Sequence, residues 1–332
     1  MITGAAGFIG FHTSLAFLER GASVVGIDNI NSYYDPSLKR ARLEILEKFS
    51  NFIFLQEDIS KRDAFKSTLN KIDINGVVHL AAQAGVRHSF EHPEEFIPSN
   101  LSGFYNVAEL AVERQAEHFI FASSSSVYGG NPVRPFSETG SADHPLSLYA
   151  ATKKANEVMA HALAHINGLP TTGLRFFTVY GPWGRPDMSF FRFARQIIAG
   201  EPIKLHNHGK MTRDFTYIDD IVSGLLAAYD RPASIDPYWA KEPTPASSGH
   251  APFRLFNLGS SNPVNLESYV QAFEAVIGKK AIREYVEMHP GEAIDTESDT
   301  NAIAEWTGYR PSTSLNDGIA KFVAWYRKYY NV

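Results

Sequence analysis

Short apolar runs that alternate with longer amphipathic stretches constrain the fold of this chain more than any other feature. Three such runs lie at 24–28, 76–80 and 118–122, and the segments 171–177 and 253–258 look like further strands. Short continuous apolar runs between helical stretches indicate βαβ units and a buried parallel sheet. We therefore predict an α/β fold built on a Rossmann-type, doubly wound parallel sheet.

A glycine-rich loop stands where the first strand of such a sheet meets its first helix. Gly4, Gly7 and Gly10 follow the pattern G-x-x-G-x-x-G. Glycine permits the tight turn and lets backbone N–H groups approach a pyrophosphate at a helix N-terminus. Only residues 1–3 precede the loop, so either the true start lies upstream or the first strand is clipped. The loop predicts a dinucleotide cofactor, which we expect to contact Gly4, Gly7, Phe8 and Ile9.

The end of the next strand favours NAD over NADP as this cofactor. Asp28 is placed to accept hydrogen bonds from an adenosine ribose, and its carboxylate repels a 2′-phosphate; a strand-end cap is the alternative role. Asp58 meets the adenine or caps a helix, and Asn100 contacts the cofactor or caps the helix before Leu101. The other expected cofactor contacts are Asn29, Asn31, Ile59, Leu80, Ala81, Ala82 and Phe176.

A Tyr and a Lys in the middle of the chain supply the chemistry that such a cofactor needs. Tyr149 and Lys153 stand one helical turn apart, so they share a helix face. An ammonium beside a phenol lowers the pKa of the phenol by stabilising the phenolate. The pair predicts a base that removes a hydroxyl proton while a nicotinamide accepts hydride; two solvated residues on a helix face are the alternative.

Composition excludes several other kinds of protein. A net charge of -5 gives no support for nucleic-acid binding, and no apolar run is long enough to span a bilayer. The absence of cysteine rules out disulfides, thiolate zinc sites and cysteine nucleophiles, and it fits a reducing compartment. The 12 histidines form no spacing that suggests a metal site. We expect a cytoplasmic protein with no metal, nucleic-acid or membrane partner.

The regular alternation of strands and helices loosens after Gly181. Residues 182–186 form a loop, and 232–252 are rich in Pro, Ala and Ser, as in an exposed insertion. We expect a smaller, substrate-binding domain to close over a ligand at the carboxyl ends of the strands. The predicted division is a NAD-binding Rossmann domain of 1–178 and 214–258, and a smaller domain of 179–213 and 259–332.

Six segments spread over the chain carry a resemblance to a known family. They are 28–35, 80–87, 123–129, 148–157, 174–188 and 213–220. These segments resemble the extended short-chain dehydrogenase/reductases that modify nucleotide sugars, and most of all the UDP-glucuronate 4-epimerases. The resemblance covers essentially the whole chain. It implies NAD as cofactor, UDP-glucuronate and UDP-galacturonate as substrate and product, and a homodimer that pairs helices near 104–114 and 149–165.

The resemblance also implies roles for the catalytic residues. Tyr149 is the general base, and Lys153 is its electrostatic partner and holds the nicotinamide ribose. Ser124 matches the catalytic serine of UDP-galactose 4-epimerases, whereas glucuronate epimerases tend to use the hydroxyl at the position of Ser126. Since alternate residues of a strand point the same way, we expect both hydroxyls to face the sugar 4-hydroxyl.

The substrate contacts implied by the resemblance begin at the sugar carboxylate, which needs Arg or a cluster of hydroxyl and amide donors. Thr178 and Arg185, in the loop after a predicted strand, lie beside the carboxylate, and Arg87 is a second candidate. Glu292 stands where the family has an Asp that binds the uridine ribose. Arg213 is expected to clamp the pyrophosphate with the help of Arg192, and Lys204 and His206 to lie at the uracil. The other residues expected to contact the substrate are Val86, Ser124, Ser125, Ser126 and Tyr149.

Three other functions stay open at this point. A decarboxylase that forms UDP-xylose has the same fold and catalytic pair and differs only in how the carboxylate is held. A 4-epimerase of neutral UDP-hexoses is the second. A non-catalytic NAD-binding module is the third, and the intact Tyr149 and Lys153 argue against it. A 4,6-dehydratase is disfavoured, because Ser and Val replace the Asp–Glu pair that follows its catalytic hydroxyl residue.

Overall fold

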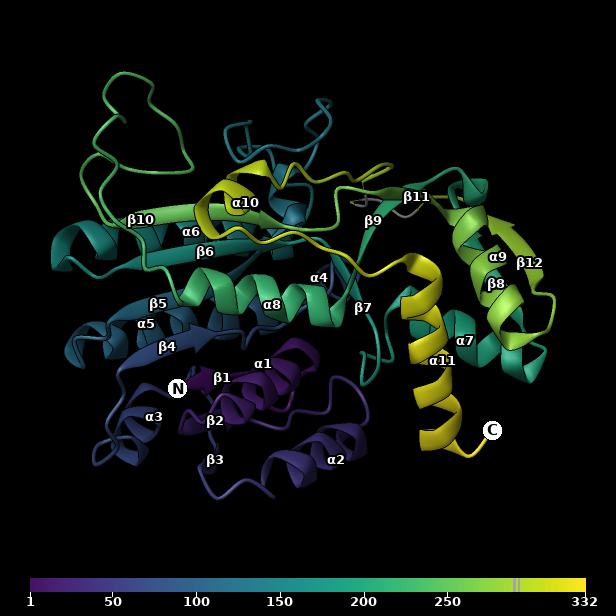
Figure 1. The fold of residues 1–332 in the computed structure, drawn as a ribbon, viewed down its shortest axis with the longest axis horizontal. Coiled ribbons are helices and arrows are strands. Elements are labelled where there is room, and N and C mark those ends of the chain that lie inside the picture. Colours follow the sequence, from purple (N-terminus) through teal and green to yellow (C-terminus); the bar gives the residue numbers. More distant parts are fainter. Residues whose placement is uncertain (289–290, 292) are drawn as a thin grey trace.

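Seven parallel strands form the central sheet of the protein, which is described here by a computed structural model covering residues 1–288, 291 and 293–332 (Figure 1). The strand order β10-β6-β5-β4-β1-β2-β3 places the topological switch point between β1 and β4. The predicted doubly wound α/β fold is confirmed. The strands are β1 (Ile2–Thr3), β2 (Val24–Asp28), β3 (Phe52–Gln56), β4 (Gly76–His79), β5 (His118–Ser124), β6 (Thr171–Phe176) and β10 (Phe253–Leu258).

The first strand has two residues and still lies at the centre of this sheet. Ile2 pairs with β2 on one side and β4 on the other, and so does Thr3. The amino group of Met1 donates a hydrogen bond of 2.8 Å to the carbonyl oxygen of Gly76, and burial lowers the pKa of that amine to about 5. The hydroxyl of Thr3 lies 2.7 Å from Nδ1 of His79. Backbone pairing on both sides therefore fixes the start of the glycine loop.

Helices cover both faces of the sheet and bury a separate apolar core on each. Successive strand residues enter opposite cores, Val24 one and Val25 the other, as the alternation of strand side chains requires. One face carries α1 (Phe8–Glu19), α2 (Pro36–Leu46), α8 (Ile218–Tyr229) and α10 (Asn301–Thr307). The other carries α3 (Arg62–Thr68), α5 (Gly103–Glu113) and α6 (Leu148–Asn167).

A smaller group of elements lies beyond the carboxyl ends of the strands, to which the arrowheads point in Figure 1. It contains a three-stranded sheet and a two-stranded sheet. Its strands are β7 (Thr178–Tyr180), β9 (Thr212–Tyr217) and β11 (Pro263–Asn265) in the first, and β8 (Pro202–His206) and β12 (Ile282–Val286) in the second. Its helices are α7 (Ser189–Ala199), α9 (Leu266–Ile277) and α11 (Leu315–Tyr330).

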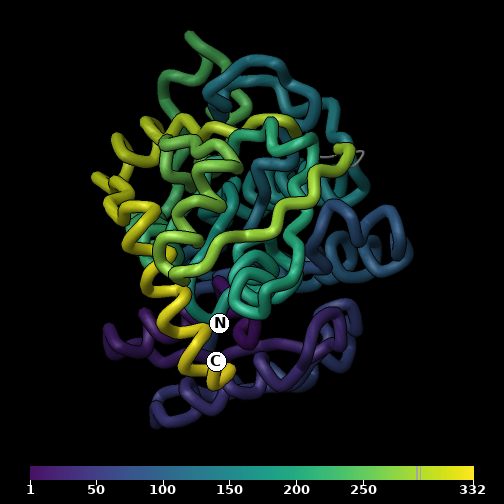
Figure 2. Tube along the Cα trace, turned by 90° about the vertical axis from the view of Figure 1, so that its right-hand side faces the viewer, coloured from purple at the N-terminus to yellow at the C-terminus, as the bar shows by residue number. Residues whose placement is uncertain are grey.

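The two groups of elements share one apolar core, in which Phe8 of α1 meets Phe190 of α7 with ring centroids 6.2 Å apart. Helix α11 runs from the smaller group down to the N-terminal half of the chain (Figure 2). Helix α10 packs on β10 and α8, against the large sheet. The division into two domains at the predicted residues stays a prediction.

The segment 232–252 forms a largely exposed loop between α8 and β10, as expected of an insertion. Within the described residues, no helix combines the length and apolar character needed to cross a membrane. The remaining short helices are α4 (His88–Glu91), Pro93–Glu95, Ile97–Ser102, Ser125–Tyr128 and Asn207–Gly209.

Candidate functional site

A cavity of about 890 Å³ opens at the carboxyl ends of the central strands, where the two groups of elements meet. Its wall includes the glycine loop, the ends of β2, β4, β5 and β6, and residues of α7, β8 and β9. Every described residue predicted for the site lines this cavity, with the exception of Asn100. Glu292 lies outside the described residues, so its predicted contact is not tested.

The glycine loop has the geometry that a dinucleotide needs. Gly4 has a φ of +74°, a conformation that favours glycine. A Cβ on Gly10 would collide with the carbonyl oxygen of Gly4, so a side chain there has no room. Gly7, Phe8 and Ile9 line the cavity at the start of α1, whose first N–H groups have no partners within the helix. These groups fit a pyrophosphate.

Asp28 stands at the adenosine end of this cradle. One of its carboxylate oxygens accepts a hydrogen bond from the backbone N–H of Ala6 and the other from that of Ile30, at 3.2 and 2.9 Å. Asp28 therefore does cap the strand end, but each oxygen keeps a second lone pair for a ribose hydroxyl. Lys39, which the sequence reading missed, lies 4.0 Å away and donates to Asn31 at 2.7 Å.

Asn100 does not cap a helix, which was one of its two predicted roles, and its predicted contact with the cofactor stays a prediction. It is 1% exposed in a π-helical turn, and its side chain neither lines the cavity nor caps a helix. Its Oδ1 accepts a hydrogen bond from the backbone N–H of Gln83, and its Nδ2 donates to the carbonyl oxygen of Gln83 and to Thr152. A buried amide needs several partners, and here they join the loop after β4 to α6.

The first two turns of α6 place Tyr149 and Lys153 on the cavity. The helix starts at its cap, Ser147, whose Oγ accepts a hydrogen bond from the backbone N–H of Ala150. Lys153 is 4% exposed, and its Nζ donates to the carbonyl oxygen of Ala122 at 2.8 Å. Burial lowers the pKa of Lys153 to about 8. The two residues share one helix face, as predicted.

The direction of the Tyr149 pKa in this structure differs from the one expected from Lys153. Burial raises the pKa of the Tyr149 phenol, because a phenolate loses its hydration there. A hydrogen bond with Ser124 and the positive charge of Arg185 act in the opposite direction. Ser124 and Arg185 are therefore the groups that act to lower the pKa of this phenol.

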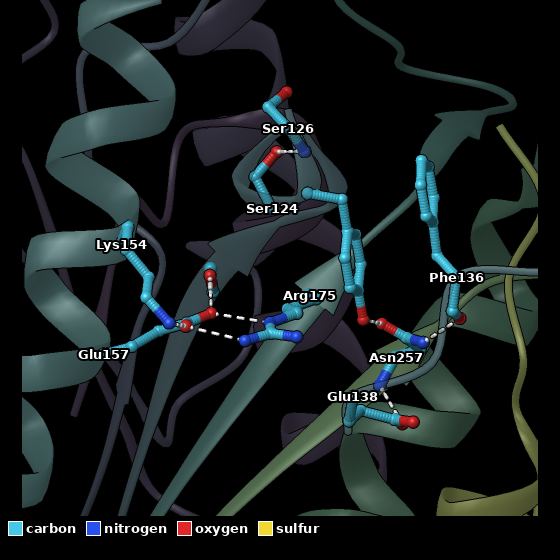
Figure 3. Close-up of polar contacts among 10 residues, drawn as sticks. Ser124, Ser126, Phe136, Glu138, Lys154, Glu157, Arg175 and Asn257 are labelled. Carbon is cyan, nitrogen blue, oxygen red and sulfur yellow. Dashed lines mark hydrogen bonds and ion pairs between the residues drawn. The ribbon is translucent and has the colours of Figure 1, made fainter. Parts of the chain in front are cut away.

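The alternation argument for the two serines is also wrong, although both line the cavity. Strand β5 ends at Ser124, and Ser126 lies in the 3-10 helix that follows. The Oγ of Ser124 accepts a hydrogen bond of 3.2 Å from the backbone N–H of Ser126, so Ser124 caps that turn (Figure 3). The two hydroxyls thus reach the cavity from a strand end and from a tight turn.

A buried polar network lies behind this turn (Figure 3). Glu157, one turn after Lys153, forms a two-pronged ion pair with Arg175, with both hydrogen bonds at 2.8 Å. Glu157 also accepts a hydrogen bond of 2.6 Å from Ser123, next to the catalytic candidate Ser124. The Arg175 guanidinium lies 4.8 Å from the ring centroid of Tyr128. The network ties α6, β5 and β6 together beneath the site.

In the cavity wall, Arg185 forms an ion pair with Asp187, a residue that was not predicted for the site. Nε of Arg185 donates to Oδ1 of Asp187 at 3.1 Å, and Nη2 donates to Oδ2 at 2.8 Å. Tyr33, also missed, donates its hydroxyl to Oδ2 of Asp187 at 3.1 Å. Both lie within segments already singled out for resemblance, but their pairing joins residues far apart in sequence. Thr178 begins the short strand β7, where a loop was expected.

One part of the cavity is lined by basic side chains from three elements, namely Arg192 of α7, Lys204 and His206 of β8, and Arg213 of β9. Arg213 donates to the carbonyl oxygens of Ala293 and Ile294, both at 2.7 Å. A concave surface with several cations suits a diphosphate. These four residues line one cavity, as expected, and their individual contacts remain predictions.

Two histidines and a glutamate form one group with metal-like spacing, which was not predicted. His88, Glu91 and His92 recur at helical spacing, and their potential ligand atoms lie within 4.8 Å of one another. Nε2 of His88 already lies 2.8 Å from a carboxylate oxygen of Glu95. Glu91 and His92 are exposed. The group is a surface cluster at the edge of the cavity.

Comparison with known proteins identifies the family. Residues 1–240 match the family described as "NAD dependent epimerase/dehydratase family". The chain belongs to that family. Its cofactor is accordingly NAD, which the glycine loop and Asp28 fit.

Individual relatives cover nearly the whole chain. A probable UDP-glucuronate 4-epimerase of Rhizobium meliloti (strain 1021) is 43% identical over 331 residues, which are 99% of this chain and 97% of that protein. UDP-glucuronate 4-epimerase 4 of Arabidopsis thaliana is 45% identical over 336 residues, 100% of this chain and 76% of that protein. The crystal structure of UDP-glucuronic acid 4-epimerase from Bacillus cereus with UDP-glucuronic acid and NAD has a TM-score of 0.85 at 32% identity, covering 99% of both chains.

Proposed function

We propose that the protein is a UDP-glucuronate 4-epimerase that interconverts UDP-glucuronate and UDP-galacturonate with a retained NAD. One observation carries the proposal. Arg185, the residue proposed to bind the sugar carboxylate, lines the same cavity as Tyr149, the proposed base. A carboxylate-binding cation next to a general base suits a sugar acid better than a neutral sugar. The relatives named above act on UDP-glucuronate by their names.

In this mechanism Tyr149 takes the proton of the sugar 4-hydroxyl at its phenol oxygen and later returns it. Ser124, hydrogen-bonded to that phenol, and Ser126 hold the 4-hydroxyl in place. When bound, NAD supplies the hydride acceptor for carbon 4 and the hydride donor for its return. The 4-keto sugar rotates about its phosphate linkage between the two transfers and so presents its opposite face. Lys153 holds the nicotinamide ribose through its ammonium.

Arg185 and Thr178 hold the carboxylate during this rotation. The intermediate is a β-keto acid, so it loses carbon dioxide readily when the bond to the carboxylate stands perpendicular to the ketone plane. Holding that bond near the ketone plane prevents the loss. Arg185 supplies a planar donor that fixes a carboxylate direction, and Arg87, which lines the same cavity, is a second candidate donor.

The nucleotide is held at the other end of the cavity. Arg213 and Arg192 clamp the pyrophosphate, and Lys204 and His206 flank the uracil. Glu292 keeps a predicted contact with the uridine ribose.

We also propose a cytoplasmic homodimer in which α5 and α6 pair with those of a second copy. Tyr105 of α5 and Val158 of α6 are 41% and 61% exposed, as such a contact requires.

The test is incubation of the purified protein with UDP-glucuronate and no added NAD, followed by chromatography of the sugar nucleotides. UDP-galacturonate as the product supports the proposal, and Tyr149→Phe should abolish it while NAD stays bound. Removal of a general base slows catalysis by about 10²–10⁴-fold. UDP-xylose or a 4-keto pentose would make the protein a decarboxylase. Equal turnover of UDP-glucose would make it a neutral-sugar epimerase, and no product in any reaction would refute an enzymatic role.

A further inference from the structure

The orientation of Arg185 is set by Asp187, a residue that takes no part in the proposed mechanism. Asp187 engages the Nε and Nη2 edge of the guanidinium through both carboxylate oxygens. This pairing leaves Nη1 outside the ion pair. A guanidinium is planar and rigid, so fixing one edge fixes the direction of the others.

A second residue of the cavity wall, Tyr33, contacts both members of this pair. The Tyr33 hydroxyl donates to Oδ2 of Asp187, and the Tyr33 ring centroid lies 5.9 Å from the Arg185 guanidinium carbon. Tyr33 itself is held against His88, with ring centroids 4.7 Å apart. A Cβ on Gly85 would come within 2.7 Å of the Tyr33 hydroxyl, so only glycine leaves room for it there. Contacts from three chain segments thus define one position for Asp187.

We propose that Asp187, supported by Tyr33, is the positioning residue that aims Arg185 at the sugar carboxylate and so keeps the 4-keto intermediate from losing carbon dioxide. This inference rests on the proposed function. Asp187 does not bind the substrate itself, because a carboxylate repels a carboxylate. Its two oxygens act on Arg185, and only Arg185 meets the sugar acid.

The reaction that Asp187 suppresses can be written in full. In the 4-keto intermediate the bond between carbon 5 and the carboxylate carbon breaks, and carbon dioxide leaves. The electron pair of that bond passes to carbon 5 and is delocalised onto the ketone oxygen as an enolate. Carbon 5 then takes a proton from water, which gives a UDP-4-keto-pentose. The hydride removed from carbon 4 stays on the cofactor, so one reduced nicotinamide accompanies each carbon dioxide that is lost.

The experiment compares wild type with Asp187→Asn, an isosteric change that weakens the hold on Arg185. The ratio of UDP-4-keto-pentose to UDP-galacturonate should rise about tenfold or more, because a small misplacement of a positioning group changes rates by such factors. Reduced nicotinamide should accumulate in the same proportion. The Kd of UDP-glucuronate, measured by calorimetry, should stay within about threefold of wild type, since Arg185 keeps its charge.

Three further variants separate positioning from other effects. Tyr33→Phe should raise the ratio less than Asp187→Asn, and Asp187→Glu should restore part of the wild-type ratio. Asp236 of the loop 232–252 forms another Arg–Asp pair, at 3.0 Å with Arg254 of β10. Asp236→Asn breaks this pair and should leave the ratio unchanged. An unchanged ratio in Asp187→Asn overturns the proposal, and so does loss of UDP-glucuronate binding. If wild type itself forms no UDP-galacturonate, the proposed function fails, and this inference fails with it.

Discussion

The buried ion pair between Glu157 and Arg175 should be one of the strongest single contributions to the stability of this fold. The two side chains are 2% and 0% exposed. Removing the charge in Glu157→Gln leaves Arg175 charged, because a guanidinium does not give up its proton in a protein. Each charge-assisted hydrogen bond contributes about 1.5–3 kcal/mol. In Gln the amide NH2 can no longer accept one of the two bonds from Arg175, and the amide oxygen accepts the other without its charge. Breaking one partner of a buried pair costs about 3–5 kcal/mol, so we expect a loss in that range.

The measurement is guanidinium unfolding of the NAD-loaded protein, followed by tryptophan fluorescence. Asp230→Asn is the matched control, because it breaks an ion pair with Arg20 whose partners are about half exposed, and it should cost about 1 kcal/mol or less. The double variant Glu157→Gln/Arg175→Met removes both charges and should be more stable than Glu157→Gln alone. A cost for Glu157→Gln no larger than that of the control would refute the reasoning, as would a double variant less stable than the single one.

The same ion pair has a pH dependence with a definite sign. The pKa of Glu157 is lowered in the folded protein by the hydrogen bonds and charge of Arg175, which outweigh the opposing effect of burial. A carboxyl with a lowered folded pKa stabilises the protein above its unfolded pKa. This stabilisation is lost as the pH falls through the folded value. Acid unfolding of wild type should therefore be steeper than that of Glu157→Gln.

Three other changes have definite expected outcomes. Burial raises the pKa of Glu138 from 4.5 to about 7, so stability should fall as the pH rises through that window, and Glu138→Gln should flatten the dependence of Tm on pH. Gly10→Ala should cost about 1–3 kcal/mol and release NAD on purification, as measured by chromatography of the retained cofactor; unchanged NAD content would contradict the loop geometry. Asp28→Asn should weaken NAD binding about tenfold and reduce the preference for NAD over NADP, as measured by titration with each cofactor.

The sheet and the position of the cavity could be predicted because their signals are local. Apolar runs mark strands, and a glycine pattern marks the turn that binds a dinucleotide. The carboxyl ends of parallel strands meet at one edge of the sheet, so residues as far apart as Asp28 and Phe176 could be placed on one cavity. Even a first strand of two residues was placed correctly, because the motif that follows it fixes its end.

The errors arose where tertiary context decides the outcome. Asn100 was assigned by its position before a helix, but its partners are backbone groups of Gln83 and a hydroxyl on α6. Ser126 was placed by strand alternation, but the strand ends two residues earlier. The segments that contain Glu157 and Arg175 were both singled out, yet nothing in either segment shows that these two side chains meet. Such pairings depend on which strand lies beside which helix, and a single sequence does not encode that locally.

The pKa of Tyr149 depends on several parts of the site and not on its neighbour in the helix alone. Adjacency to Lys153 suggested a phenol that ionises readily, but burial in this cavity favours the neutral phenol. Burial also disfavours the charged form of Lys153 and lowers the pKa of its ammonium to about 8. The positive charge that acts on Tyr149 comes from Arg185, on a different segment, and Asp187 partly neutralises that charge. A bound nicotinamide adds a further positive charge to the cavity. On the proposed function, we therefore expect deprotonation of the sugar by Tyr149 to depend on the bound cofactor and on the position of Arg185.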